Sequence, residues 1–124
     1  MAVWKFGVHF GGGNNPSHYD FIKEEGIAIG HRPHAPFSNG DLVIITDGFT
    51  VKAIVGIVEE PWPITDKPGY AFVEEAYNIT YGPDTIVAKA EWYDFPFWYQ
   101  LVRAGNQVHD PERIRVIENI WNNR

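Results

Sequence analysis

Residues 39–60 read NGDLVIITDGFTVKAIVGIVEE, and this stretch predicts a β-hairpin at the centre of the fold. Two apolar runs rich in β-branched residues, 42–46 and 51–58, are separated by Asp-Gly-Phe-Thr at 47–50. Asp-Gly favours a tight turn, because glycine adopts positive φ without steric cost. Both runs are apolar on both faces along part of their length, so we expect the hairpin inside a core. Gly56 interrupts the second run and predicts a β-bulge or the close approach of another backbone.

The chain is long and apolar enough to form one domain with its own core. It has 124 residues, of which 44% are hydrophobic and 15% aromatic, and we expect a single domain over residues 1–124. The absence of cysteine excludes disulfides and thiolate metal sites and is typical of a reducing compartment, so we expect a cytoplasmic protein. No apolar run of about 18 residues and no secretory leader pattern is visible, so we expect no membrane partner.

The net charge of −6 argues against a protein that holds long nucleic-acid duplexes through their phosphates. It does not argue against a protein that accepts one base in a pocket. Five basic residues that could form a local basic rim are scattered along the chain, and scattered basic residues usually belong to the solvated surface. They are Lys5, Lys23, Arg32, Lys52 and Arg103.

The segments around the hairpin predict further strands and two helices. Residues 2–7 and 27–30 are apolar enough for strands, and Ser17 predicts the N-cap of a short helix that Gly26 ends. After the hairpin, residues 70–81 and 85–94 predict two more strands.

A second helix is predicted to begin at Asp110-Pro111, an N-cap followed by proline at the first helical position. Its apolar residues, Ile114, Ile117, Ile120 and Trp121, share one face, so we expect it to lie across the sheet. The whole pattern predicts an α+β fold. It would be a small, strongly curved or closed mixed β-barrel of five to seven strands with two or more flanking helices.

Several short motifs occur in a recognisable order along most of the chain. Ala-Val-Trp-Lys-Phe opens it at residues 2–6, followed by a polar loop, a short helix and Gly-Asp-Leu-Val at 40–43. Val-Gly-Ile-Val-Glu at 55–59 then precedes a Trp-Pro pair, and Leu-Val-Arg at 101–103 precedes the proline-started helix. Each motif alone is short and unspecific, but their colinear order resembles the EVE domains of the PUA-like superfamily.

The resemblance implies a small β-barrel with flanking helices and a nucleic-acid ligand. It also implies a relation to the YTH domain, which reads methylated adenine in RNA, and to EVE domains, which are thought to read modified bases in DNA or RNA. The sequence departs from the family where an apolar-Lys-Ser-Glu-Pro run usually follows the first strand. Here that place holds Lys-Phe-Gly-Val-His at residues 5–9, followed by a glycine-rich loop.

A pocket for an unstacked base must supply aromatic faces and matched donors and acceptors, and stacking on one aromatic side chain contributes about 1–3 kcal/mol. We therefore predict a nucleic-acid-binding module that recognises a base, in particular a modified base, in an aromatic-lined pocket. The candidate ligand-binding residues are Lys5, Phe6, Asn14, Asn15, Ser17, Tyr19, Trp62, Trp92 and Phe95.

Each candidate also has a purely structural interpretation. Aromatic residues in a small barrel are mostly core, and Asn14 and Asn15 beside glycines are typical turn residues. Ser17 fits a helix cap, and Asp41 fits a residue that fixes the entry into the first hairpin strand.

Two alternatives remain open at the level of sequence. The first is a small ribonuclease of the related ASCH type, with Lys5, His9 and Tyr19 as candidates for acid–base work. No cysteine nucleophile, Gly-x-Ser-x-Gly elbow or phosphate-binding loop is present, so we predict no catalytic residue and no cofactor. The second is a protein-interaction domain with a protein partner, which the acidic charge favours.

The histidines invite a metal-site interpretation. His31 and His34 are three residues apart, and His9 and His18 are near in sequence. The pair His31 and His34 lies on no predicted helix, and no acidic partner sits at ligand spacing, so we predict no metal.

Overall fold

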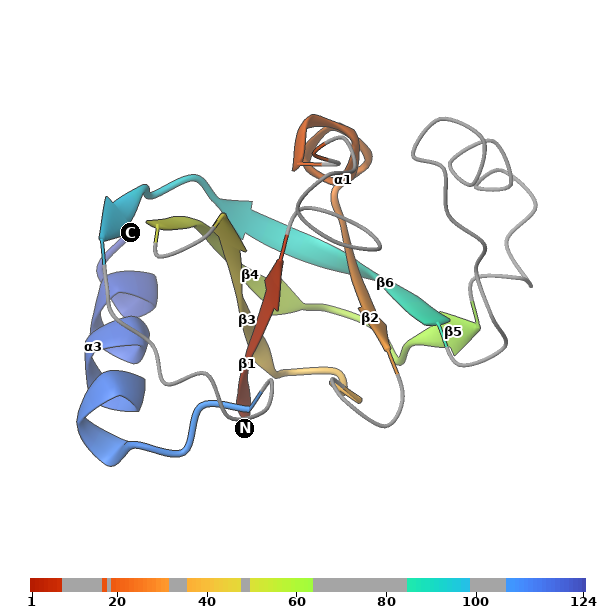
Figure 1. Cartoon of the computed structure of the whole chain (residues 1–124). Coiled ribbons are helices and arrows are strands. Elements are labelled where there is room, and N and C mark those ends of the chain that lie inside the picture. Colours follow the sequence, from red (N-terminus) through yellow and green to blue (C-terminus); the bar gives the residue numbers. More distant parts are fainter. Residues whose placement is uncertain (8–16, 18, 32–35, 48–49, 64–84, 99–106) are drawn as a thin grey trace.

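Seven strands and two helices are formed by the residues that a computed structural model of the chain describes (Figure 1). The described residues are 1–7, 17, 19–31, 36–47, 50–63, 85–98 and 107–124. In chain order the elements are β1 (Val3–Gly7), α1 (Tyr19–Glu25), β2 (Ile27–His31), β3 (Leu42–Asp47), β4 (Thr50–Ile57), β5 (Trp62–Pro63), β6 (Thr85–Tyr93), β7 (Phe97–Trp98) and α3 (Pro111–Asn122). The strand predicted at residues 70–81 lies outside the described residues.

The strands form one mixed sheet that curls into a half-barrel (Figure 1). Its order is β1-β3-β4-β6-β2, with β5 paired to β6 and β7 paired to β4. β1 runs parallel to β3, and the other pairs are antiparallel. The predicted α+β fold with a strongly curved mixed sheet and flanking helices is therefore confirmed.

The predicted hairpin is present as β3 and β4, and most of its residues are buried. Residues 48–49 of the turn lie outside the described residues. The second strand ends at Ile57, and Val58 is exposed, which corrects the predicted end of that strand. The ladder is irregular at one point, because Ile45 pairs with Ala53 and Thr46 pairs with Val51.

Gly56 is not a bulge, which corrects one expectation from the sequence. It pairs in register with Leu42 on one side and with Glu91 on the other. A close approach does occur there, but it comes from the indole of Trp121 in α3 and not from another backbone. Glycine is required at this position because a larger residue would occupy the space of the indole ring.

The two faces of the sheet bury two separate apolar clusters. Side chains alternate between faces along each strand. Trp4, Val43 and Val55 accordingly belong to the inner cluster of the curl, and Ile22 of α1 joins them from one end.

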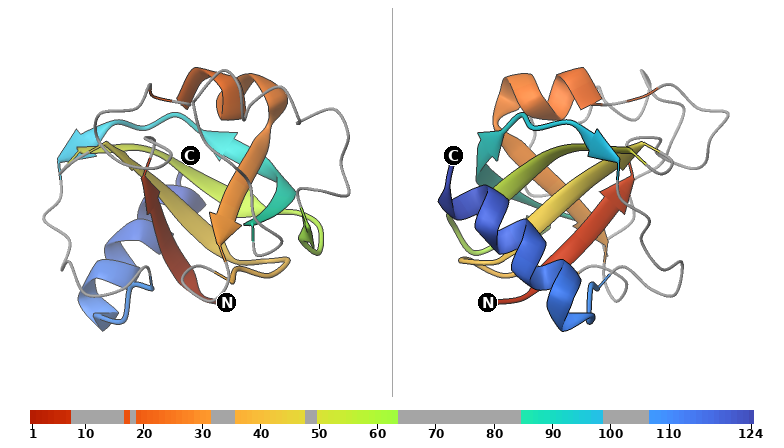
Figure 2. Two further views of the ribbon diagram at one scale, coloured as in Figure 1. Left: turned by 45° about the vertical axis from the view of Figure 1, so that its right-hand side comes forward. Right: turned by 90° about the vertical axis from the view of Figure 1, so that its left-hand side faces the viewer.

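The outer cluster contains Val3, Leu42, Ile44 and Ile54 and is covered by α3. This helix crosses the outer face of β1, β3 and β4 diagonally (Figure 2). The predicted apolar face of the helix, Ile114, Ile117, Ile120 and Trp121, packs against this cluster, which confirms the expectation from its spacing. Asp110 is the N-cap, and its carboxylate accepts the backbone N–H of Glu112 at 3.0 Å.

Asp41 fixes the entry into β3, as the sequence predicts. Its carboxylate accepts hydrogen bonds from the backbone N–H of Ala2 at 2.9 Å, the indole N–H of Trp4 at 3.0 Å and the backbone N–H of Ser38 at 2.9 Å. The side chain is buried, so these bonds satisfy a carboxylate that has little contact with water. Asp41 thereby joins the start of β1 to the start of β3.

The helix α1 begins and ends within two residues of the positions that the sequence predicts. The Ser17 hydroxyl accepts the backbone N–H of Tyr19 at 3.3 Å, so it acts as a capping group at the first turn. Gly26 ends the helix with a φ of 66°, a conformation that glycine adopts without strain. Among the described helices, none is long and apolar enough to cross a membrane.

Candidate functional site

Two of the predicted binding residues, Tyr19 and Trp92, meet at the end of the curled sheet where α1 packs. Their rings form an edge-to-face pair, with centroids 5.8 Å apart and an interplanar angle of 73°. The indole N–H of Trp92 donates to the backbone carbonyl of Ile27 at 3.2 Å. Both rings pack, half-buried, against the inner cluster, as does Phe6 of β1. The fold therefore gathers three predicted residues from three elements around the inner core.

Asp94 ties α1 to the end of β6. Its carboxylate accepts the Tyr19 hydroxyl at 2.6 Å and pairs with the Lys23 ammonium at 2.6 Å. Burial raises the pKa of Tyr19 far above its ordinary value, and the hydrogen bond and charge of Asp94 raise it further. The hydrogen bonds from Lys23 and then Tyr19 lower the pKa of Asp94. Tyr19 thus stays protonated at neutral pH, and its hydroxyl donates to Asp94.

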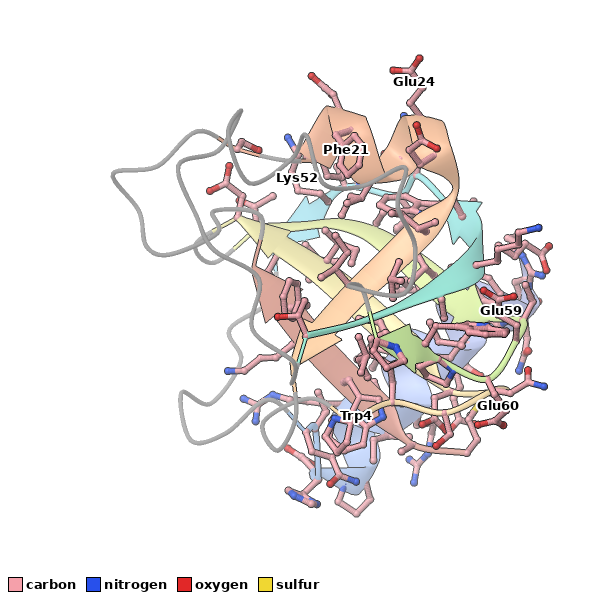
Figure 3. The ribbon with its side chains drawn as sticks, turned by 90° about the vertical axis from the view of Figure 1, so that its right-hand side faces the viewer. Trp4, Phe21, Glu24, Lys52, Glu59 and Glu60 are labelled. Atoms are coloured by element: carbon pink, nitrogen blue, oxygen red, sulfur yellow. The ribbon has the colours of Figure 1, made fainter. Side chains whose placement is uncertain are left out.

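Lys52 reaches the same ring because of the irregularity in the hairpin. It is the extra residue between Val51 and Ala53 that has no partner on β3, so the ladder contains a β-bulge there. Its ammonium lies 5.0 Å from the centroid of the Tyr19 ring, and that of Lys23 lies 5.9 Å from it. Figure 3 shows Lys52 beside α1, the helix that also carries Phe21.

We call Tyr19, Lys23, Lys52, Trp92 and Asp94 the Tyr19 cluster. Its members come from α1, β4, β6 and the residue after β6. It presents aromatic surface beside two ammonium groups, while the polar atoms of its rings donate hydrogen bonds inside the protein. Such a combination can stack a flat ligand and attract an acceptor or an anion.

Lys5 lies on the other face of the sheet from this cluster. It alternates with Trp4 and Phe6 of the inner face and shares the outer face with Val3, which α3 covers. Lys5 is partly buried, and burial lowers its pKa. Lys5 is therefore not brought together with Tyr19 and Trp92.

Trp62 and Phe95 are both exposed, and Trp62 lies away from the paired rings. Trp62 pairs with Val87, five positions from Trp92 along β6, which corresponds to about 17 Å of strand. Its side chain is 51% exposed. Phe95 stacks on Tyr93 with centroids 5.3 Å apart, and Tyr93 pairs with Ile54 of the outer cluster. Among the described residues, no ring contact joins Trp62 or Phe95 to Tyr19 and Trp92.

Several predictions fall outside the described residues and stay predictions. They concern Asn14 and Asn15 as binding residues and His9 as the acid–base candidate of the alternative ribonuclease function; His18 and His34, which were considered and rejected as metal ligands, also lie outside the described residues. In the part of the chain that the structure describes, no group of three histidine, aspartate or glutamate side chains is arranged to hold a metal ion.

The sequence did not single out Asp94, although it organises the cluster. It follows the last strand residue and precedes Phe-Pro, a context that marks a loop and nothing more. Lys23 and Lys52 were considered only as scattered basic residues, with Arg32 and Arg103, which lie outside the described residues. The sequence does contain one indication of a special role for Lys52, because it is the one charged residue within the apolar run 51–58.

No protein-family model, curated protein or solved structure matches this chain. The resemblance to EVE domains therefore stays a prediction. A functional conclusion has to come from the chemistry of the Tyr19 cluster and its place in the curled sheet.

Proposed function

We propose that this protein is a nucleic-acid-binding module of PUA-like type that accepts a single base at the Tyr19 cluster. The observation that carries the proposal is the meeting of Tyr19 and Trp92, from α1 and β6, with the Lys52 ammonium 5.0 Å from the Tyr19 ring centroid. The base is a modified one in this proposal, as the resemblance to EVE and YTH domains implies.

Stacking supplies the main attraction in the proposed complex. Stacking of a base on an aromatic side chain contributes about 1–3 kcal/mol of binding free energy. This contribution does not depend on which donors and acceptors the edge of the base carries. The hydrogen bonds from Tyr19 to Asp94 and from Trp92 to Ile27 hold both rings in place before a ligand arrives. A ring that is already fixed loses little conformational entropy on binding, which favours affinity.

Discrimination between bases would come from groups around the rings. The Lys52 ammonium can donate to a carbonyl oxygen or an unprotonated ring nitrogen on the edge of a base. A methyl group on the base would add apolar contact with an aromatic side chain, worth about 0.8 kcal/mol if it is fully buried. The net charge of −6 is compatible with this mode, because a single base in a pocket involves few phosphates.

The test is an NMR titration of the whole chain with nucleosides and short single-stranded oligonucleotides, each with and without a methylated or hydroxymethylated base. We expect one modified base to shift the indole N–H resonance of Trp92 and the amide resonances of α1 more strongly than its plain parent. Absence of any shift at millimolar ligand across the panel would remove the proposal.

A pair of matched variants locates the site. Tyr19→Leu should weaken binding of the selected base about tenfold, since it removes one stacking surface. Phe21→Leu makes the same kind of change two residues away on α1, where the ring packs against the inner cluster, and should leave affinity unchanged. Equal losses in both variants would indicate a general effect of loosening α1 and would contradict a base site at Tyr19.

A further inference from the structure

We propose that the ligand of the Tyr19 cluster is an anionic nucleotide whose phosphate is bound by Lys52, while Asp94 restrains Lys23 from joining it. This inference rests on the proposed function and names the class of ligand. Its basis is the distribution of charge around one ring: two ammonium groups lie 5.0 and 5.9 Å from the Tyr19 centroid, but the carboxylate of Asp94 pairs with only one of them.

The two lysines differ in what they contact. Lys23 forms an ion pair with Asp94 at 2.6 Å. Among the described residues, Lys52 has its ammonium over the Tyr19 ring and no carboxylate within ion-pair distance. An ammonium on an aromatic face can bind an oxyanion as a point charge without breaking an existing ion pair.

The other charges that face Tyr19 are acidic. Asp94 and, to a smaller extent, Asp20 both raise the pKa of Tyr19 by their charge. The charges of Lys23 and Lys52 in turn lower the pKa of Asp94. The Tyr19 cluster thus holds two ammonium groups and one carboxylate without ligand, and an added phosphate would compete with Asp94 for Lys23 while it contacts Lys52 directly.

The position of Lys52 links the anion site to the base site. The β-bulge places this residue outside the regular pairing of β3 and β4, and its backbone carbonyl lies 3.5 Å from the Tyr19 hydroxyl. Bulges commonly re-aim a side chain at a functional site. The aromatic face for a base and the ammonium for its phosphate are therefore neighbours, which is the arrangement a nucleotide requires.

The experiment is calorimetric titration of the full chain with adenosine, cytidine, their methylated derivatives, the corresponding 5′-monophosphates, and inorganic phosphate alone. We expect the monophosphate of the preferred nucleoside to bind about tenfold more tightly than the nucleoside, a ratio typical of one charge-assisted contact. This advantage should shrink as salt is raised, because the contact is electrostatic and partly exposed.

Four variants separate the roles of the charges. Lys52→Gln keeps a donor for the base edge but removes the charge, so it should abolish most of the phosphate advantage, whereas Lys52→Arg, which keeps the charge, should retain the advantage. Lys89→Gln makes the same change at an exposed lysine of β6 and should alter neither affinity. Asp94→Asn releases Lys23 and should strengthen monophosphate binding about threefold, by the removal of one competing carboxylate.

The outcomes distinguish this inference from the proposed function. Equal affinity for nucleoside and monophosphate, or an advantage that survives in Lys52→Gln, overturns the anion site and leaves the base site standing. Binding of inorganic phosphate that depends on Lys52, with no binding of any nucleoside, supports the anion site and removes the proposed function. If neither inorganic phosphate nor any nucleoside binds, both the anion site and the proposed function are excluded.

Discussion

The indole of Trp121 lies so close to Gly56 that a Cβ atom on the glycine would stand 2.6 Å from Cζ2 and 3.1 Å from Cη2 of the ring. This contact joins α3 to the C-terminal end of β4. The Arg124 guanidinium lies 3.6 Å from the centroid of the same indole and pairs with Glu91 at 2.9 Å. Glu91 is the partner of Gly56 in β6, so the end of the helix is attached to both strands.

Gly56→Ala should therefore destabilise the protein by about 1–3 kcal/mol, the usual cost of an added methyl group in a packed interior. The new methyl group would displace the Trp121 ring and loosen α3 from the sheet. Gly7→Ala is the matched control, because a Cβ at Gly7 meets nothing within 4 Å. Denaturant unfolding of both variants measures the difference, and equal stabilities would show that Trp121 moves aside without cost.

Asp41→Ala should lower the free energy of unfolding by about 2–4 kcal/mol, since donors buried without a partner are costly. The indole N–H of Trp4 and the backbone N–H of Ala2 and of Ser38 would all lose their acceptor. Glu24→Ala, at an exposed position on α1, should change stability by less than about 0.5 kcal/mol. A loss for Asp41→Ala no greater than that of Glu24→Ala would contradict a structural role for this carboxylate.

The pairing of Asp94 predicts a small acid sensitivity. Its pKa is lower in the folded protein than in the unfolded chain, where it is about 3.9, because Lys23 and Tyr19 donate to the carboxylate. The stabilising contribution is thus present above about pH 4 and is lost as the pH falls through the lower folded value. It should stay below about 1 kcal/mol, because the pair is half-exposed.

Unfolding measured between about pH 5 and pH 2 should therefore show a steeper loss of stability for the wild-type chain than for Asp94→Asn. Lys23→Gln should show an intermediate slope, since it removes the largest cause of the lowered pKa. A wild-type curve parallel to that of Asp94→Asn would mean that the ion pair does not form in solution.

Tyr19→Phe should cost about 1–2 kcal/mol at neutral pH, because it removes a short hydrogen bond to a charged acceptor. The pKa of Tyr19 is raised on folding, so this contribution is fully present below the unfolded value of about 10 and is lost as the pH rises through the folded value.

The measurement for this prediction is an alkaline titration of tyrosinate absorbance, compared between the wild-type chain and Tyr19→Phe. The chain has six tyrosines, and Tyr19 should ionise only at pH values well above 10 or on unfolding. A tyrosine that titrates near pH 10 in the wild type and is missing in Tyr19→Phe would refute the hydrogen bond from Tyr19 to Asp94.

The elements that the sequence predicts best are those with strong local signals. The hairpin strands follow from two apolar β-branched runs, and α3 follows from Asp110-Pro111 and its apolar spacing. The role of Asp41 at the entry into β3 also follows, since the polar residue directly precedes a buried strand. Local patterns decide these features because capping, periodicity and burial act within a few residues.

The candidate site is only partly predictable from the sequence, because it depends on contacts between residues that lie far apart in the chain. Tyr19 and Trp92 were selected as aromatic residues, and the fold does bring them together from α1 and β6. Lys5 was selected as well, but strand alternation puts it on the outer face with Val3. Trp62 was selected for the same reason as Trp92, as an aromatic residue. The pairing of Trp62 with Val87 nevertheless separates the two tryptophans along β6.

The sequence by itself determined the strands of a buried hairpin and a capped helix with one apolar face, because those features depend on short-range order. Only the tertiary structure decided which side chains share a site. Asp94, Lys23 and Lys52 meet at Tyr19 because a bulge in β4 and the packing of α1 on the inner cluster bring them there. Contacts between residues 33 to 75 positions apart have no local signature, since they arise from the closure of the sheet.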